Sequence, residues 1–289
     1  CNHVFYRVVL EAMGKAERLA GFVHLPMGQV AGEQGLARAA AIMIRAILKT
    51  SIRAAAVEFE PTPDAVQANF MRMEQITAEL AARNVDMVLF PEMAFLGLAH
   101  ESLDQMLALN PVVAEDGGLA RLSLMAERYR LYLGAGLAVM DGGRPYNAYV
   151  LFGPDGQELL RYRKNHLYGD DFNWAEPGGG QYPVADTPMG RVGLLICHDV
   201  VYREAFEPYI RSGTDLLIIG TNWIGPTPMS QYLFPWMGRI PAMLVSDRRG
   251  QEQGAVFYGN TQALIPQGPV LPESLSTGDR AAITIIAGP

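Results

Sequence analysis

Residues 191–199 read RVGLLICHD, and the fold prediction starts from this stretch. The apolar run through residues 191–197 predicts a strand buried on both faces, because such strands lack the usual alternation of polar and apolar residues. The strand ends at Cys197, polar residues follow, and residues 202–211 are then predicted to form a helix that ends before Gly213. A strand, a reactive side chain and a helix in that order are typical of α/β proteins.

The alternation of strands and helices continues on both sides of this stretch. Further strands are predicted at residues 52–58, 85–90, 131–139, 146–152, 158–163 and 215–220. Helices are predicted over residues 66–80, with Thr62-Pro63-Asp64 as the N-cap, and over residues 119–130. Buried central strands mixed with hairpins predict a layered α/β architecture, which two sheets packed between helices would satisfy.

The first fifty residues follow a different pattern, and we predict a division into residues 1–50 and 51–289. An apolar stripe with a spacing of about 3.6 residues predicts a helix over residues 36–48. Fifty residues are too few to bury an α/β core alone. Because the chain begins with Cys1 rather than Met, we expect either processing or a longer reading frame.

The composition argues against several classes of protein. The 289 residues include 23 basic and 30 acidic ones, and a formal net charge of −7 disfavours binding to nucleic acid or to an acidic membrane surface. The most apolar stretch, residues 39–57, contains three basic side chains, so no membrane span is predicted, and no signal peptide is recognised. Cys1 and Cys197 cannot form a disulfide framework, which indicates a reducing compartment and a cytoplasmic protein.

Three reactive side chains follow predicted strands. Glu92 follows VDMVLFP, Lys164 follows ELLRYR, and Cys197 ends RVGLLIC. Loops at the carboxyl ends of central strands are where α/β proteins place their functional sites. A carboxylate can accept the thiol proton, and an ammonium can stabilise both the thiolate and the oxyanion of a tetrahedral intermediate. These groups suffice for acyl transfer at a carbon–nitrogen bond, so neither a metal nor a cofactor is expected.

The residues around these three positions resemble the nitrilase (carbon–nitrogen hydrolase) superfamily over about residues 52–289. The motifs are FPEM at 90–93, YRKNHL at 162–167 and LICHD at 195–199, and supporting marks are YNA at 146–148, PG at 177–178 and TNW at 221–223. The resemblance implies a four-layer αββα sandwich, a thioester intermediate, and a homodimer or higher oligomer formed through the outer helices. It also implies Glu92 as general base, Lys164 as oxyanion stabiliser and Cys197 as nucleophile.

The resemblance further implies a second acidic residue in the loop after the lysine. Asp170, Asp171 and Glu176 are the candidates, and the spacing from Lys164 favours Asp170.

Three residues are expected beside the substrate. They are His198, Asn222 and Trp223. For His198 the alternative is an ordinary polar neighbour that orients the loop, and for Trp223 it is a core aromatic residue.

The functional prediction is a thiol hydrolase that cleaves a small amide or carbamoyl compound and releases ammonia or an amine. His198-Asp199 after the nucleophile favours these substrates over nitriles. A nitrilase with the same three residues is one alternative, and a catalytically silent domain that binds a partner is another.

The N-terminal segment has a separate resemblance. CNHVFY at 1–6 and GFVHLP at 21–26 are similar to the C-terminal part of a cysteine-type pyroglutamyl peptidase. The resemblance implies Cys1 as nucleophile and His24 as its base. The third catalytic group of that family and the strands before its nucleophile would lie upstream, so the segment is predicted to be an inactive remnant, with peptidase activity as the alternative.

Overall fold

The computed structural model describes residues 3–11, 18–26, 51–97, 100–109 and 117–287. The chain divides into two compact units, Cys1–Ser51 and Ile52–Pro289, which are described separately. None of the helices in the described ranges is long and apolar enough to cross a membrane.

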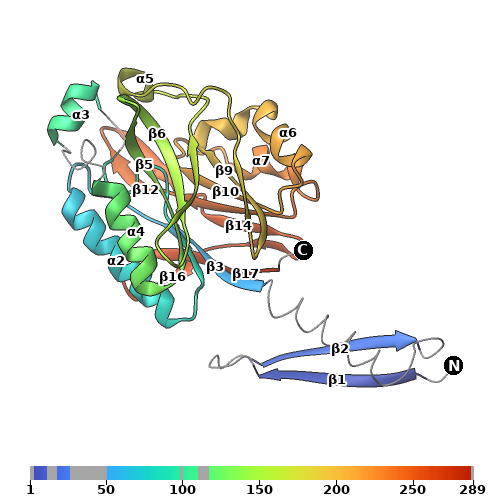
Figure 1. Cartoon of the computed structure of the whole chain (residues 1–289). Coiled ribbons are helices and arrows are strands. Elements are labelled where there is room, and N and C mark those ends of the chain that lie inside the picture. The colour runs from blue at the N-terminus through green and yellow to red at the C-terminus, as the bar shows by residue number, and fades with distance from the viewer. Residues whose placement is uncertain (1–2, 12–17, 27–50, 98–99, 110–116, 288–289) are drawn as a thin grey trace. The chain divides into compact units, whose positions relative to one another are not determined.

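The described part of the first unit is a β-hairpin (Figure 1). Strand β1 (His3–Glu11) pairs antiparallel with β2 (Arg18–Pro26), and the register sets Phe5 opposite His24. The helix predicted over residues 36–48 and the residue Cys1 lie outside the described residues.

The second unit contains a seven-stranded and a six-stranded sheet. The first has the order β16-β17-β3-β4-β5-β6-β7, built from β3 (Ser51–Glu58), β4 (Met87–Leu89), β5 (Tyr132–Asp141), β6 (Arg144–Phe152), β7 (Glu158–Arg163), β16 (Glu273–Ser274) and β17 (Arg280–Ala287). The second has the order β15-β14-β11-β10-β9-β8, built from β8 (Val184–Thr187), β9 (Gly190–Ile196), β10 (Leu216–Thr221), β11 (Ala242–Asp247), β14 (Gln262–Ile265) and β15 (Gly268–Val270). A separate hairpin consists of β12 (Arg249–Glu252) and β13 (Ala255–Tyr258).

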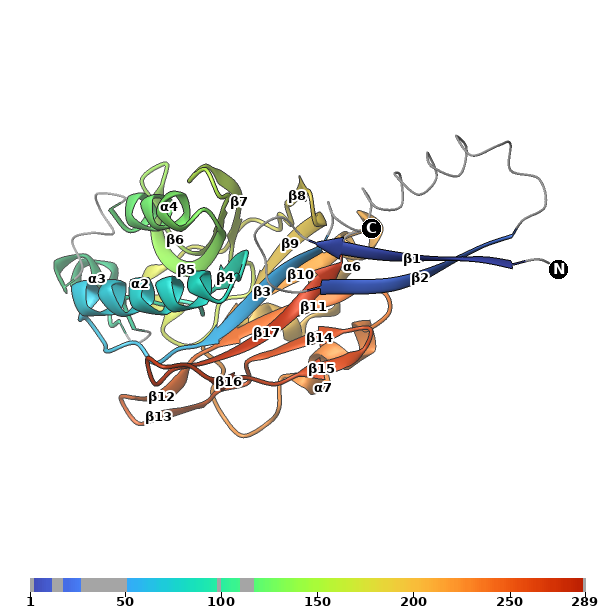
Figure 2. The same ribbon diagram turned by 90° about the horizontal axis from the view of Figure 1, so that it is seen from below.

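The two sheets pack face to face, and helices cover their outer faces (Figures 1 and 2). The helices α2 (Val66–Ala82) and α4 (Gly117–Tyr129) share one apolar core with the seven-stranded sheet. The helices α6 (Arg203–Arg211) and α7 (Ser230–Leu233) share the other core with the six-stranded sheet. This order of layers confirms the predicted αββα sandwich. The shorter helices α3 (Leu103–Leu109) and α5 (Asp171–Trp174) complete the described α-helices.

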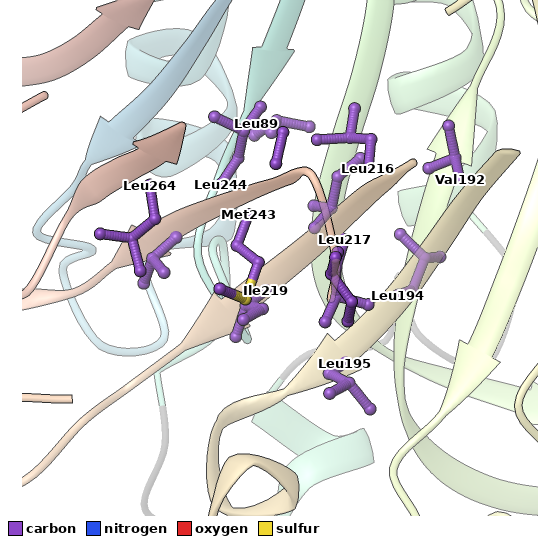
Figure 3. Close-up of a cluster of buried hydrophobic side chains, with 14 of the residues drawn as sticks. Leu89, Val192, Leu194, Leu195, Leu216, Leu217, Ile219, Met243, Leu244 and Leu264 are labelled. Atoms are coloured by element: carbon purple, nitrogen blue, oxygen red, sulfur yellow. The ribbon is translucent and has the colours of Figure 1, made fainter. Parts of the chain in front are cut away.

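The strand β4 explains why the apolar runs are continuous. Met87 and Leu89 belong to the core between the sheets, whereas Val88 belongs to the core beneath α2 and α4. Successive side chains of a strand point to opposite faces, so a strand covered on both sides needs apolar residues throughout. Figure 3 shows Leu89 in the first of these cores, together with Leu217 of β10 and Leu244 of β11.

The parallel pairing of β9 and β10 brings two segments of the predicted site together. In this register Ile196, the last residue of β9, lies opposite Gly220, so Cys197, which follows β9, leaves the sheet beside Thr221, the last residue of β10. The sandwich therefore gathers loops that are distant in sequence at one edge.

The predicted N-cap of α2 is wrong. The helix begins at Val66 with Ala65 as the N-cap, and no side chain caps it. Asp64 has a φ of +56°, so the chain turns before the helix starts. The side chain of Asn69 serves this turn instead, because its Oδ1 accepts a hydrogen bond from the Thr62 amide at 2.9 Å.

Candidate active site

Glu92 lies just beyond β4 and only 1% of it is exposed. Its Oε1 accepts hydrogen bonds from Lys164 Nζ and from Asn147 Nδ2, each at 2.7 Å. Its Oε2 accepts a hydrogen bond from the backbone amide of Asn222 at 2.9 Å. Both carboxylate oxygens are thus fixed in direction, as a group that must receive a proton at a defined place requires.

Lys164 follows β7 and is as deeply buried as Glu92. Its Nζ lies 2.7 Å from Glu92 Oε1 and 2.6 Å from Asp171 Oδ2. Burial opposes the charge of this lysine, but the carboxylates of Asp171 and Glu92 outweigh burial and hold its pKa well above the usual value. Lys164 is therefore an ammonium ion throughout the neutral range.

The acidic residue that meets the lysine is Asp171, not Asp170. Asp171 is buried at the start of α5, and its Oδ1 accepts a hydrogen bond from Asn147 Nδ2 at 3.0 Å. Asp170 is exposed, and its carboxylate faces Asn173 Nδ2 at 3.5 Å. Glu176, the third candidate, forms an ion pair with Arg144 at the surface.

Asn147 is a site residue whose contacts the sequence did not reveal. In the sequence it stands only within the YNA motif at 146–148, whereas in the structure its Nδ2 donates hydrogen bonds to the carboxylates of both Glu92 and Asp171. The sequence does contain an indication that Asp171 is buried. Trp174 follows three residues later, and residues at that spacing share one face of a helix. Both are buried on that face.

Cys197 opens the short 3₁₀ helix η2 (Cys197–Val201) directly after β9. Its φ of +43° lies in the left-handed region, which is costly for a residue with a side chain and is common at functional sites. Burial raises the pKa of its thiol, Glu92 raises it further, and Lys164 opposes the shift. The charges of both partners act on the sulfur, so the structure brings the three predicted residues together. The resting thiol holds its proton and needs a base before it can attack.

Asp199 fixes the turn that carries the cysteine. Its Oδ2 accepts hydrogen bonds from the Ile196 amide at 3.1 Å and from the Tyr162 hydroxyl at 2.8 Å. Its Oδ1 accepts a hydrogen bond from the His166 amide at 2.9 Å and lies 2.8 Å from His166 Nδ1. A fully buried carboxylate thus ties the cysteine turn to the end of the strand that carries Lys164.

A cavity of about 270 Å³ opens beside Cys197. His198, Asn222 and Trp223, the three residues expected beside the substrate, all line it. His198 Nδ1 lies 3.2 Å from the carbonyl oxygen of Leu167, and the Trp223 indole donates a hydrogen bond to the carbonyl oxygen of residue 227 at 2.8 Å. The site therefore combines a buried acid–ammonium pair, a thiol and an accessible space.

Within the described ranges, no cluster of three or more histidine, cysteine, aspartate or glutamate side chains is arranged to hold a metal ion.

Comparison with known proteins places this arrangement in a family. The model of the family described as carbon-nitrogen hydrolase matches residues 53–284. A protein named nitrilase from Pyrococcus abyssi is 25% identical over 236 residues, covering 81% of this chain and 89% of its own length. The human omega-amidase NIT2 is 36% identical over 169 residues, which are 52% of this chain and 60% of that protein.

Solved structures show the same fold. An amidase from Nesterenkonia superposes with a TM-score of 0.68 at 22% sequence identity, and the superposition covers 83% of this chain and 91% of that one. The family model spans most of this chain and includes Glu92, Lys164 and Cys197. The chain therefore belongs to the carbon–nitrogen hydrolase family.

Proposed function

We propose that this protein hydrolyses a carbon–nitrogen bond of a small amide or carbamoyl compound, outside peptides, through a thioester on Cys197. The observation that carries the proposal is the buried contact of Glu92 with Lys164, at 2.7 Å, beside a thiol that lines a cavity. A base and a cation held close to a nucleophile that a substrate can reach are what acyl transfer requires.

The reaction follows from the positions of these groups. Glu92 takes the proton of the Cys197 thiol, and the sulfur attacks the carbonyl carbon to form a tetrahedral intermediate. The Lys164 ammonium and the backbone amides near Cys197 stabilise the oxyanion. The carbon–nitrogen bond breaks, the nitrogen leaves as ammonia or an amine with the proton from Glu92, and a thioester remains. Glu92 then takes a proton from water, the hydroxide attacks the thioester, and the acid departs as the thiol regains its proton.

Asp171 and Asn147 act as positioning residues in this proposal. Asp171 keeps Lys164 charged, and Asn147 donates hydrogen bonds to both carboxylates, which holds the two side chains in fixed orientations. Preorganised groups of this kind avoid the cost of rearrangement during the reaction.

The names of the relatives favour amides. Omega-amidases and deaminated glutathione amidases are among the relatives of 30% identity or more, and these alignments cover about 60% of their lengths. The Pyrococcus relative carries the name nitrilase, so a nitrile substrate is the second candidate. Offering a nitrile and its matching amide separates the two. Association into a homodimer or a higher homo-oligomer through the outer helices stays a prediction.

The test uses the two cysteines of the chain. Cys197→Ala should reduce the turnover of an amide panel by at least about 10³-fold, since it removes the group that forms the covalent bond. Circular dichroism checks that the fold is kept. Intact-protein mass spectrometry with fluoroacetamide should show an adduct on Cys197, as a solved mutant of the Nesterenkonia amidase carries the acetamide moiety of that compound at its active site cysteine.

The matched control is Cys1→Ser. This variant should keep both turnover and labelling, because Cys1 has no role in the proposed reaction. Turnover that persists in Cys197→Ala, or labelling that disappears in Cys1→Ser, contradicts the proposal. A pyroglutamyl-peptide substrate offered to the same two variants decides whether Cys1 has peptidase activity.

A further inference from the structure

The cavity beside Cys197 carries no formal charge on its walls. None of the described residues that line it is a lysine, arginine, aspartate or glutamate. Its volume of about 270 Å³ lies near the lower end of the roughly 300–1,000 Å³ that small-molecule pockets occupy. Beside a neutral His198, a charged group bound here would lose its water without gaining an ionic partner from these walls.

The buried group behind the thiol adds to this preference. One ammonium on Lys164 and two carboxylates on Glu92 and Asp171 give a formal charge of +1 − 2 = −1. A substrate that carries a carboxylate would meet this charge in a poorly solvated space, where electrostatic repulsion is stronger than in water.

Asn222 supplies a polar group that nothing in the protein uses. Only 2% of this residue is exposed, yet neither its Oδ1 nor its Nδ2 has a hydrogen-bond partner among the described residues. Its backbone amide is already committed to Glu92 Oε2 at 2.9 Å. A buried carboxamide without partners costs stability, and such groups in native proteins commonly have a ligand or water as partner. Asn222 lines the same cavity as Cys197, so a bound molecule can reach it.

Apart from His198, the remaining walls are aromatic and aliphatic. The rings of Trp223 and Tyr232 meet edge to face, with 5.5 Å between their centroids. Tyr168, Val201 and Ile224 also line the cavity and are 50%, 42% and 40% exposed. Exposed apolar side chains gathered around an opening favour a ligand with an apolar body.

Building on the proposed function, we propose that this site selects uncharged amides with an aliphatic or aromatic body, and that Asn222 Oδ1 accepts a hydrogen bond from the substrate amide N–H. The amide group then lies over Cys197 while the body of the substrate contacts Trp223 and Tyr232.

The first experiment compares substrates that differ only in charge. Hexanamide and adipamate, the monoamide of adipic acid, have the same chain length, and one ends in a methyl group where the other has a carboxylate. We expect kcat/KM for hexanamide to exceed that for adipamate by at least about tenfold, which corresponds to about 1.4 kcal/mol. Equal values, or a preference for adipamate, overturn the inferred specificity.

The second experiment does not depend on turnover. Acrylamide and methyl acrylate both alkylate thiols. Only acrylamide has an N–H group that can donate a hydrogen bond to Asn222 Oδ1. In Asn222→Ala we expect the rate of Cys197 labelling by acrylamide to fall about two- to twelvefold relative to labelling by methyl acrylate, as one hydrogen bond of about 0.5–1.5 kcal/mol predicts. Gln157→Ala, which removes an exposed carboxamide from a surface turn, is the matched control and should leave the ratio unchanged.

The two experiments distinguish a failure of the proposed function from a failure of the inferred role of Asn222. If no amide is hydrolysed while Cys197 is labelled, the proposed function fails, and the labelling ratio still decides the role of Asn222. If Asn222→Ala slows both electrophiles equally, or neither, Asn222 does not bind the amide and the inference is overturned.

Discussion

Lys164 stabilises two buried carboxylates as well as serving the proposed reaction. Its Nζ is the cation between Glu92 and Asp171, which are each 1% exposed. Lys164→Met would leave two acidic groups close together in a buried place, and breaking a buried ion pair in this way costs about 3–5 kcal/mol. We expect urea denaturation to show a loss of this size in the free energy of unfolding.

Arg144→Met is the matched control. It removes an ion pair with Glu176 in which both side chains are well exposed, and we expect a change of about 0–1 kcal/mol. Adding Glu92→Gln and Asp171→Asn to Lys164→Met should restore part of the lost stability, because no uncompensated charge then remains. A loss in Lys164→Met no larger than that in Arg144→Met would show that the ion pair does not stabilise the fold.

The three central residues could be picked from the sequence because each stands at or just beyond the end of a predicted strand. The choice between Asp170 and Asp171 could not be made in this way. Neighbouring residues of a helix point about 100° apart, so which one faces Lys164 depends on where α5 begins. That start rests on tertiary contacts, among them the hydrogen bond from the Tyr168 amide to Asp171 Oδ2 at 3.1 Å.

At the scale of elements, the sequence predicted the strands and helices better than their assembly. The continuous apolar run of β4 reflects burial on both faces, and that property is local. The order of strands within each sheet depends on contacts between distant segments, for example β17 beside β3, and no local pattern contains it. The N-cap of α2 was placed too early, at residues 62–64 instead of Ala65, because the positive φ of Asp64 has no clear mark in the sequence.

The strand β5 positions Glu92 through a glycine. The Gly136 amide donates a hydrogen bond to the Pro91 carbonyl at 2.9 Å, and the Ala94 amide donates one to the Gly136 carbonyl at 2.9 Å. A Cβ at position 136 would lie 2.4 Å from Glu92 Cα, closer than atoms can approach. Gly136→Ala should therefore displace Glu92 and lower kcat about 100-fold, since a shift of about 1 Å can have that effect. Steady-state kinetics with the best amide of the panel measures it.

Gly143→Ala separates this effect from a general loss of stability. Gly143 lies in the exposed turn after β5 with a φ of +78°, so alanine is strained there, but no atom lies within 4 Å of the added Cβ. This variant should lose about 1 kcal/mol of stability and keep its kcat. If Gly136→Ala also keeps its kcat, the close packing against Glu92 does not position the base.

The stability of the whole molecule should depend on pH through Asp247. This residue ends β11 and is fully buried, and no ion pair to it is found within the described part of the chain. Burial raises its pKa from 3.8 to about 7, although hydrogen bonds from the amides of Trp223, Asn260 and Arg248 act in the opposite direction. The hydrogen bond from the Trp223 amide connects Asp247, at the end of β11 in the six-stranded sheet, with the segment that forms one wall of the cavity.

The sign of the effect follows from proton binding. Between about pH 4 and pH 7 the folded protein holds a proton on Asp247 that the unfolded chain has released, so this residue's contribution to stability is complete at low pH and is lost as the pH rises through about 7. Asp247→Asn cannot titrate. We expect the free energy of unfolding of the natural protein, relative to Asp247→Asn, to fall by about 2–3 kcal/mol between pH 5 and pH 8.

Urea denaturation of both proteins at the two pH values measures this difference, and the comparison holds even where the asparagine variant is less stable at every pH. Asp155→Asn, in the exposed turn between β6 and β7, is the control and should follow the natural protein across the same range. Parallel pH dependence of the natural protein and Asp247→Asn would mean that Asp247 is ionised in the folded state already at pH 5. Its four N–H donors would then outweigh the cost of burial, and the wall that contains Trp223 would be held by a carboxylate at every pH in this range.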